Sequence, residues 1–396
     1  MRWIDGGKQR VPIASWCADI EPGAMKQAEN VAAHPRVFHH VALMPDCHQG
    51  FGMPIGGVAG FLGAVIPNAV GVDIGCGMRA VRTNFPAAEA DPHRVRRCLE
   101  RLRKRIPVGE GHAHSRAQSW ERFDELPDWL DKRGRDLARH NLGTLGGGNH
   151  FIELQAGDDG FLWLMLHSGS RNLGYRIAEH HHRKAVARCR REGIRLPSEE
   201  LAFLDAESDA GEAYIREMHF ALDYARENRA RMTAVFRETV MEVFGAVEFD
   251  REIDIHHNYA ALEEHFGEKV WLHRKGATAA REGETGIIPG SMGASSYIVR
   301  GLGNPDSFCS CSHGAGRRMG RLEASRTLSR EACDRAMEGI VFFGWQPLRG
   351  RGKKGRGLLD LSEAPQAYKD IDEVIAAERD LVEPLVRLRP LGVLKG

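Results

Sequence analysis

The sequence predicts an α+β protein in which mixed β-sheets are flanked by helices, with a long helical insertion at about residues 175–244. Three observations predict this fold. Short apolar runs rich in β-branched residues occur towards both ends of the chain, long charged stretches of helical character lie between them, and 42% of the 396 residues are hydrophobic, which is enough for a large core. The chain has no internal repeat and no long linker, so we expect residues 1–396 to form a single domain.

The N-terminal fifth of the chain is predicted to be mostly sheet. Residues 37–44 and 55–66 are short apolar runs that end at Pro45 and Pro67, and residues 79–85 alternate as a strand does. Proline ends such runs because it cannot donate a backbone hydrogen bond to a neighbouring strand.

Helices and a further strand pair are expected next. Residues 91–105 begin with an aspartate that can cap a helix and a proline at the first helical position, and residues 115–140 are rich in charged side chains. Both are expected to be surface helices. After a glycine cluster, residues 151–154 and 161–166 predict two paired strands.

The helical insertion should form a hairpin on one side of the sheet. It consists of residues 175–192 and 198–244, and a break near Ala210 and Gly211 is expected to divide the second part. Short strands then return at residues 253–256, 269–273, 286–289 and 296–300. Residues 370–385 predict a closing helix.

Charge and cysteine content narrow the class of protein. The 55 Lys and Arg residues balance 54 Asp and Glu, so a net charge of +1 gives no overall attraction to nucleic acid or membranes, and any polyanion site has to be local. The eight cysteines are scattered, as is typical of a reducing cytoplasm. Residues 1–10 are too charged for a secretory signal, and prolines and glycines interrupt the uncharged run at 47–72. We therefore expect a cytoplasmic protein without a membrane segment.

A glycine-rich stretch, residues 71–78, carries two potential metal ligands. It reads Gly-Val-Asp-Ile-Gly-Cys-Gly-Met and places Asp73 and Cys76 three positions apart. Three glycines allow backbone turns in which both ligating atoms face one point. The alternative interpretation is a buried turn with an inert thiol.

Three histidines extend this candidate metal site. His150, His167 and His257 each lie at the end of a predicted strand, where side chains meet at a common rim. With Asp73 and Cys76 they make five candidate ligands, which exceeds the four of a closed structural site and suggests two metals or one metal with a changing shell. Ligand softness alone favours zinc over manganese.

A fourth histidine, His313, is a candidate covalent nucleophile. It lies in the small-residue motif Ser-Cys-Ser-His-Gly-Ala-Gly-Arg, and arginines 317, 318 and 321 follow. A histidine in this setting has room for a phosphoryl group, which glycine amides and arginines would stabilise. A metal ligand or a capping residue is the alternative. The loop at residues 289–293, Pro-Gly-Ser-Met-Gly, offers further amides to a phosphate or base.

Other histidines and cysteines are interpreted more simply. Asp46 and His48 follow a predicted strand and either orient a ligand or contact a substrate. Residues 180–182 are three histidines inside a charged helix, so we expect them to be exposed. Cys309 and Cys311 have no second pair of cysteines to complete a metal site and are interpreted as buried small residues.

Taken in order, these motifs resemble the RtcB family of RNA-splicing ligases. The resemblance extends from about residue 37 to residue 396 and rests on Pro-Asp-x-His, Gly-Val-Asp-Ile-Gly-Cys-Gly, Gly-Gly-Asn-His-Phe-Ile-Glu, Leu-His-Ser-Gly-Ser-Arg, His-His-Asn, Arg-Lys-Gly-Ala, Pro-Gly-Ser-Met-Gly, Ser-His-Gly-Ala-Gly-Arg and a C-terminal Lys-Gly.

The resemblance implies an enzyme that joins RNA ending in a 2′,3′-cyclic phosphate or 3′-phosphate to RNA beginning with a 5′-hydroxyl. It implies GTP and manganese as cofactors, with two ions, and an RtcB-type fold with the metals in a deep cleft. Its RNA partners would be tRNA halves or other cleaved RNA, and an activating protein partner is possible. His313 would attack the α-phosphorus of GTP and become guanylylated.

The resemblance also implies roles for individual residues. The manganese ligands would be Asp73, Cys76, His150, His167 and His257. The nucleotide positions would be Asp46, Asn149, His150, Phe151, Ile152, Glu153, His257, Asn258, Pro289, Gly290, Ser291, Met292, Ser296, His313, Gly314, Ala315, Gly316 and Lys395. The RNA phosphate would contact Arg171, Arg317 and Arg321.

Two features depart from the family pattern. Cys47 stands where valine is common, and the basic run at residues 348–357 has the character of an insertion, which we interpret as a solvated loop rather than an extra RNA contact. Two other functions stay open. A metal-dependent phosphodiesterase would use the same ligands with metal-bound water instead of His313. A nucleotide-binding regulator would have lost activity altogether.

Overall fold

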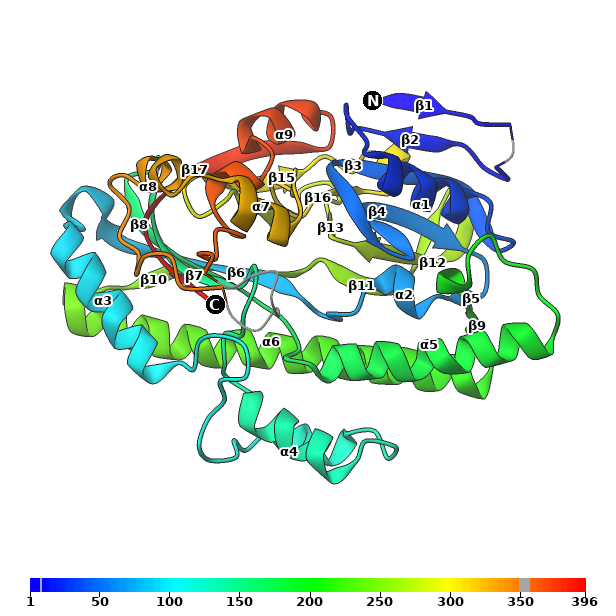
Figure 1. Ribbon diagram of the computed structural model, residues 1–396, viewed down its shortest axis with the longest axis horizontal. Helices are drawn as coiled ribbons and strands as arrows, with labels where there is room; N and C mark the ends of the chain where they lie inside the picture. Colours follow the sequence, from blue (N-terminus) through cyan, green and yellow to red (C-terminus); the bar gives the residue numbers. More distant parts are fainter. Residues whose placement is uncertain (8, 349–356) are drawn as a thin grey trace.

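Two β-sheets form the centre of the molecule (Figure 1). The computed structural model describes residues 1–7, 9–348 and 357–396. In spatial order the six-stranded sheet contains β1 (Arg2–Ile4), β2 (Ile13–Ser15), β3 (Val37–Phe51), β4 (Met53–Phe61), β12 (Glu268–Lys275) and β11 (Asn258–His265). The seven-stranded sheet contains β10 (Phe249–His256), β6 (Gly77–Pro86), β8 (Phe161–Ser168), β7 (Phe151–Gly157), β17 (Val382–Lys395), β15 (Ser296–Gly301) and β14 (Thr285–Ile288).

Smaller elements complete the sheets and cover them. Two short pairs join β13 (Ala277–Ala279) to β16 (Ser310–Ser312) and β5 (Ala64–Val65) to β9 (Leu204–Asp205). The helices are α1 (Pro22–Ala32), α2 (Pro67–Val70), α3 (Pro92–Arg105), α4 (Lys132–Asn141), α5 (Leu173–Arg191), α6 (Asp209–Phe244), α7 (Arg321–Thr327), α8 (Arg330–Ala336) and α9 (Ile371–Ala377). In this α+β arrangement β2 and β3 are parallel, whereas every other pair of neighbouring strands in the two large sheets is antiparallel.

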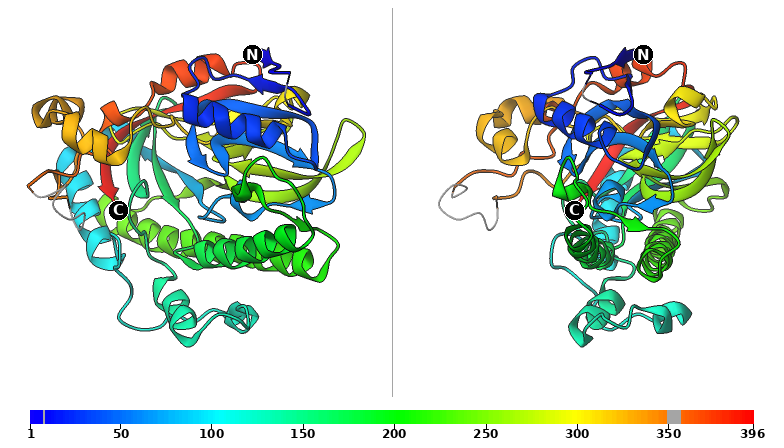
Figure 2. Two further views of the ribbon diagram at one scale, coloured as in Figure 1. Left: turned by 45° about the vertical axis from the view of Figure 1, so that its right-hand side comes forward. Right: turned by 90° about the vertical axis from the view of Figure 1, so that its right-hand side faces the viewer.

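The long helix α6 packs against both sheets. Its first half places Tyr214 and Met218 in the hydrophobic cluster of the six-stranded sheet, and its second half places Phe236 and Val240 in the cluster of the seven-stranded sheet. Figures 1 and 2 show α5 and α6 side by side below the sheets, with α4 projecting beyond them. The predicted helical hairpin on one side of the sheet is therefore confirmed.

Most predicted elements are found, and α3 illustrates why. The Asp91 carboxylate accepts hydrogen bonds from the backbone N–H groups of His93 and Arg94, and Pro92 occupies the first helical position. These contacts satisfy donors that a helix N-terminus otherwise leaves unpaired. The predicted strands before residue 300 correspond to β3, β4, β6, β7, β8, β10, β12, β14 and β15.

The expected helix over residues 198–244 is only partly correct. Residues before 208 form a short 3₁₀ turn (Glu199–Leu201) and β9, and α6 begins at Asp209, capped by the Ser208 side chain. Gly211 therefore does not break the helix. A Cβ atom there would lie 1.9 Å from the Asp205 carbonyl oxygen, so glycine lets the first helical turn pack closely against the preceding strand.

Two other helix predictions are corrected in the same way. Residues 115–140 contain only a 3₁₀ turn (Glu121–Glu125) and α4. The closing helix α9 ends at Ala377, and β17 follows between β7 and β15. The two prolines of β17, Pro384 and Pro390, lie at register irregularities, where the missing proline N–H does not interrupt the hydrogen bonds between the strands.

Two further expectations concern a membrane segment and the basic run of residues. Within the described residues, no helix is long and apolar enough to span a bilayer. The basic run interpreted as a solvated loop lies outside the described residues at positions 349–356.

Candidate metal centre and nucleophile

The candidate metal ligands meet because four neighbouring strands of the seven-stranded sheet each have one end at the same rim of that sheet. Gly77, the first residue of β6, lies opposite Ser168 of β8 on one side and His256 of β10 on the other. His167 lies opposite Phe151, the first residue of β7. Cys76, His150, His167 and His257 therefore sit at or next to the same rim, although up to 181 positions separate them in the sequence.

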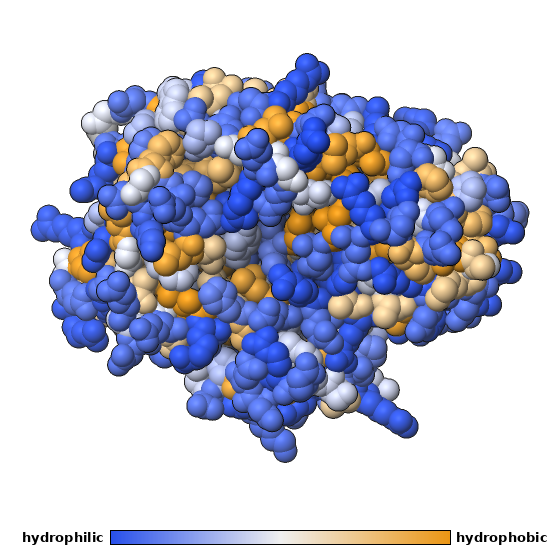
Figure 3. Space-filling model, turned by 180° about the vertical axis from the view of Figure 1, so that it is seen from behind, coloured by the Kyte–Doolittle hydropathy of each residue, from blue (hydrophilic) through white to orange (hydrophobic). Residues whose placement is uncertain are grey.

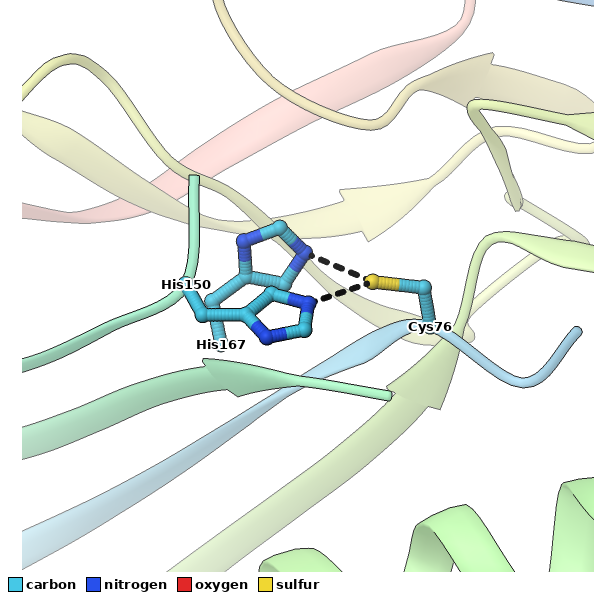
Figure 4. A group of neighbouring side chains, drawn as sticks. All are labelled: Cys76, His150 and His167. Atoms are coloured by element: carbon cyan, nitrogen blue, oxygen red, sulfur yellow. Dashed lines mark hydrogen bonds between the residues drawn. The ribbon is translucent and has the colours of Figure 1, made fainter. Parts of the chain in front are cut away.

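The ligating atoms of these residues face one another. Cys76 Sγ lies 3.2 Å from His167 Nε2 and 3.5 Å from His150 Nε2, as Figure 4 shows. His167 Nε2 is 3.3 Å from His257 Nε2, and His150 Nε2 is 3.4 Å from Asp73 Oδ2. All five candidate ligands thus lie in one cluster, and within the described residues Cys76, His150 and His167 have the mutual spacing of a group that could hold one metal ion.

A contact at the other ring nitrogen, Nδ1, fixes the orientation of the His150 and His167 imidazoles. His150 Nδ1 is 2.8 Å from the Leu145 carbonyl oxygen, and His167 Nδ1 is 3.1 Å from that of Asn149. A carbonyl only accepts, so each Nδ1 carries the proton and each Nε2 presents a lone pair to the cluster. This is the usual arrangement of histidines that bind a metal.

Burial sets the ionisation of the cluster. It lowers the pKa of His167 and of His257 well below the usual value, so both rings are neutral, which is the form that binds metal. Burial, with the adjacent Asp73 charge, raises the pKa of the Cys76 thiol well above its usual value. Burial also acts to raise the pKa of Asp73, but the interactions of its carboxylate with His150, Arg171 and Cys76 together outweigh burial and hold that pKa at about 2. A cation would bind this carboxylate directly and favour the thiolate.

The predicted nucleophile His313 lies next to this cluster. It follows β16, and its ring centroid is 4.9 Å from that of His257. The buried Asp46 carboxylate accepts from both the His313 backbone N–H (3.2 Å) and ring Nδ1 (2.5 Å). Because Nδ1 carries the proton, Nε2 holds a free lone pair.

Close packing also restrains the His313 ring at its Cε1 atom. A Cβ atom at Gly276, which has φ +57°, would lie 3.1 Å from His313 Cε1 and 2.3 Å from an Ile55 side-chain carbon. Only glycine allows this left-handed turn and this approach together. Gly276 of the Arg-Lys-Gly-Ala motif therefore helps to hold the ring of the candidate nucleophile His313 in place.

Several predicted nucleotide positions are joined by hydrogen bonds. Gln155 Nε2 donates to Glu153 Oε2 (2.7 Å) and to Ser296 Oγ (3.1 Å), and Ser296 Oγ accepts from Gly290 N–H (3.2 Å). Ala315 N–H donates to the Pro289 carbonyl (3.0 Å). These contacts bring β7, β15 and the loops after β14 and β16 together. Burial raises the pKa of Glu153 to about 7, and the charge of Lys395 opposes this effect.

Lys395 and two of the three candidate RNA arginines converge on Glu363. Its carboxylate is 3.2 Å from Lys395 Nζ, 3.2 Å from Arg317 Nη1 and 3.4 Å from Arg321 Nε. Arg317 is also held by the Ser362 carbonyl (2.6 Å) and is largely buried, whereas the Arg321 side chain is 48% exposed. The third arginine, Arg171, lies elsewhere, with Nε 3.3 Å from Thr144 Oγ1.

Comparison with known proteins places the chain in a family. The family model described as tRNA-splicing ligase RtcB matches residues 27–134 and 123–396. The chain belongs to the RtcB family. It is 40% identical to the RNA-splicing ligase RtcB1 of Escherichia coli (strain ATCC 25922), and the match covers 98% of each chain. The tRNA-splicing ligase RtcB of Thermococcus kodakarensis is 32% identical over 94% of this chain and 91% of its own.

Membership of the RtcB family agrees with the resemblance inferred from the motifs, but some site residues were missed. Gln155 is two positions from Glu153 on the same face of β7, so strand alternation could have found it. Glu363 and Glu378 stand in segments with no ligand-like pattern, and only the fold brings them to the site.

One expected surface group is buried instead. The His181 side chain is fully buried, and its Nε2 lies 2.8 Å from Glu217 Oε2 of α6. His181 shares a helix face with Ile177 and Ala185, which are four positions away on either side, and this face packs in the core. His180 and His182 are partly exposed. The prediction from charge alone was therefore wrong for the central histidine.

The carboxyl group of Glu378 is buried beside the segment that carries the nucleophile. Its Oε2 accepts from the Ser312 backbone N–H at 2.9 Å, and its exposed fraction is 0%. Burial is the main cause that raises its pKa to about 8, and the Asp46 charge adds to it although the Ser312 hydrogen bond acts in the opposite direction. Glu378 is therefore mostly protonated at neutral pH.

We expect Glu378→Gln to make stability less dependent on pH. The folded protein keeps the Glu378 proton up to about pH 8, whereas the unfolded chain loses it near its ordinary value of 4.5. Stability therefore falls as pH rises through this window, and glutamine, which cannot ionise, removes the loss. Relative to the parent, the variant should gain on the order of 3 kcal/mol in the free energy of unfolding between pH 5 and pH 8, as measured by urea denaturation. The exposed Glu282→Gln is the control, and a gain that does not change with pH would contradict the assignment.

Proposed function

We propose that this chain is an RNA ligase that joins a 2′,3′-cyclic phosphate or 3′-phosphate end to a 5′-hydroxyl end, with GTP and manganese as cofactors, in tRNA splicing or RNA repair. The observation that carries the proposal is the position of His313, whose ring lies 4.9 Å from that of the candidate ligand His257 and whose Nδ1 is bound by Asp46. Membership of the RtcB family supports the same function.

The candidate ligands Asp73, Cys76, His150, His167 and His257 fit a divalent cation. Manganese held there, as one ion or two, would neutralise charge on the phosphates. His313 Nε2 attacks the α-phosphorus of GTP, a nitrogen–phosphorus bond forms, and the bond to the leaving pyrophosphate breaks. Asp46 keeps the proton on Nδ1 and balances the positive charge that the ring acquires. The backbone N–H groups of Gly314 and Gly316 would stabilise the phosphoryl oxygens, whereas the Ala315 N–H is already bound by the Pro289 carbonyl.

The guanosine would lie among the remaining nucleotide positions. We assign base and ribose contacts to Asn149, Phe151, Ile152, Glu153, Asn258, Pro289, Gly290, Ser291, Met292, Ser296 and Lys395. Support comes from the hydrogen bonds that join Glu153 to Ser296 through Gln155 and from Lys395, whose Nζ lies 5.2 Å from the centre of the Phe151 ring. Arg171 and Arg321 then hold the RNA phosphate, and Arg317 contributes mainly by positioning Glu363.

The later steps transfer GMP to RNA. Water opens a cyclic phosphate by breaking its bond to O2′, which leaves a 3′-phosphate. An oxygen of that phosphate displaces His313 from the phosphorus of GMP, and the RNA 5′-hydroxyl then attacks the 3′-phosphate and releases GMP. Each displacement needs charge neutralised beside His313, which is where the candidate ligands gather.

Defined RNA ends test the reaction. The protein, GTP and manganese are combined with RNAs ending in cyclic phosphate, 3′-phosphate or 3′-hydroxyl and beginning with 5′-hydroxyl or 5′-phosphate. Joining is expected only for the first two 3′ ends with a 5′-hydroxyl. Hydrolysis of the ends without joining, and without any need for GTP, would contradict the proposal and favour a phosphodiesterase.

A further inference from the structure

Helices α4 and α5 both carry an excess of positive charge, as α3 also does, although the chain as a whole is nearly neutral. Helix α4 carries four Lys or Arg residues and one carboxylate, and α5 carries six and one, whereas the whole chain has 55 and 54. In Figures 1 and 2 both helices lie on the same side of the sheets. The projecting part that holds α4 is mostly hydrophilic on the face seen in Figure 3. A local excess of positive charge of this kind can attract a polyanion although the chain as a whole is nearly neutral.

A hollow of about 520 Å³ lies between the start of α4 and the first half of α5. Arg176, His180 and Arg183 line it from one face of α5, and Trp129 lines it from the segment before α4. Tyr175, also in the lining, is 45% exposed although it is a large aromatic residue. The volume is within the range of pockets that hold a small organic ligand such as a nucleotide.

The aromatic groups of the hollow are held rigidly. The Trp129 ring stacks on His180 with centroids 3.9 Å apart and planes at 5°, and its Nε1 donates to Glu217 at 2.9 Å. Burial lowers the pKa of His180 to about 4, so the stacked ring is neutral. An aromatic pair fixed on one side and an exposed Tyr175 beside it form a surface on which bases can stack.

The charges around the hollow favour an anion. Two carboxylates of the lining are paired with its arginines, Asp131 with Arg176 (2.7 Å) and Glu179 with Arg183 (3.6 Å). Lys132 and Arg133, next to Asp131, and Lys184, next to Arg183, are exposed and form no ion pair within the described part of the chain. The surplus of positive charge therefore comes from side chains at both margins of the hollow.

The hollow is linked to the candidate active site through the chain segment that leads from β8 into α5. Its residue Asn172 follows Arg171, a candidate RNA-phosphate residue, and lies five positions after the candidate ligand His167. Arg171 and Asn172 both have left-handed backbone conformations, with φ of 52° and 74°. Such strained residues persist where the surrounding structure fixes them and cluster at functional sites. Here they turn the chain from β8 into α5, so a strand bound near Arg171 can continue into the hollow.

We propose that the groove between α4 and α5 binds the single-stranded RNA next to the end being joined. Bases stack on Tyr175 and on the Trp129–His180 pair, and phosphates contact Arg176, Arg183 and the marginal cations. Single-strand sites combine these two features, aromatic rings for the bases and cations along the backbone. The proposal rests on the proposed ligase function and extends it from the reacting end to the body of the substrate.

Two variants on the same helix test the groove. Arg183→Glu reverses a charge in the lining, and Arg190→Glu makes the same change seven positions on, outside the lining; these side chains are 71% exposed in both cases, so folding should survive. Binding of 3′-phosphorylated RNAs of about 16 and about four nucleotides is measured over a range of salt concentrations. Labelling of the protein by GTP without RNA is measured in parallel.

We expect Arg183→Glu to weaken binding of the longer RNA about tenfold or more and to reduce its salt dependence, with little effect on the shorter RNA or on GTP labelling. Arg190→Glu should weaken binding by much less. Tyr175→Ala should also weaken binding of the longer RNA, and Tyr175→Trp should restore it. Equal effects of the two charge reversals, or unchanged affinity in both Arg183→Glu and Tyr175→Ala, would overturn the proposal. Failure of the unmodified protein to be labelled by GTP would instead count against the ligase function.

Discussion

Replacing Cys76 by alanine is expected to abolish stable metal binding. The Cys76 sulfur is the one soft ligand of the cluster and lies within 3.5 Å of the Nε2 atoms of both His150 and His167. Losing an outer-shell partner of a metal site costs roughly 10–100-fold in affinity, and losing a direct ligand should cost more. Titration with manganese and elemental analysis after dialysis measure the loss, and GTP labelling should disappear with it.

The matched control for Cys76→Ala is Cys98→Ala. Cys98 is also fully buried, but it packs in the hydrophobic cluster of the seven-stranded sheet and not in the metal cluster. Both substitutions remove one buried sulfur and should destabilise the fold by similar amounts. Only the Cys76 variant should lose metal. Full metal content and full labelling in that variant would show that residues 71–78 are a structural turn.

Replacing His313 by alanine is expected to reduce GTP labelling by at least about a thousandfold, because loss of an attacking nucleophile removes the bond-forming step. Manganese affinity should change little, because the five candidate ligands remain. Radiolabelled GTP and manganese titration measure the two effects separately. His219→Ala, on an exposed position of α6, is the control and should retain both. Undiminished labelling of the His313 variant would show that another residue is the nucleophile.

The candidate site could be predicted largely from the sequence because its residues belong to local patterns. Asp73 and Cys76 lie in a glycine-framed turn, and each histidine ligand is within one residue of a strand end. Strand ends that share a rim bring distant residues together, so the five candidate ligands could be grouped without knowledge of the sheet order. The turn at Gly276 is a further example. Its Arg-Lys-Gly-Ala motif can be recognised in the local sequence, whereas its contact with the His313 ring joins two segments that are distant in the sequence.

The features that could not be predicted depend on long-range packing. The segment that became β17 contains two prolines, which argue against a central strand until the register irregularities are known. His181 is surrounded by charged neighbours in sequence, yet α6 covers it and Glu217 binds it. Glu363 gathers Lys395, Arg317 and Arg321, but a single glutamate carries no signal in the sequence. Tertiary contacts decided each of these cases.

The site where GMP becomes attached tests the account most directly. The protein is incubated with GTP and manganese, digested at a pH that preserves phosphoramidates, and examined by tandem mass spectrometry. We predict one GMP adduct, on His313, that does not form when a chelator removes the metal or when Asp46→Asn leaves the ring poorly oriented. A GMP adduct on a lysine or on another histidine, or an adduct on His313 that forms without any divalent cation, would contradict the account.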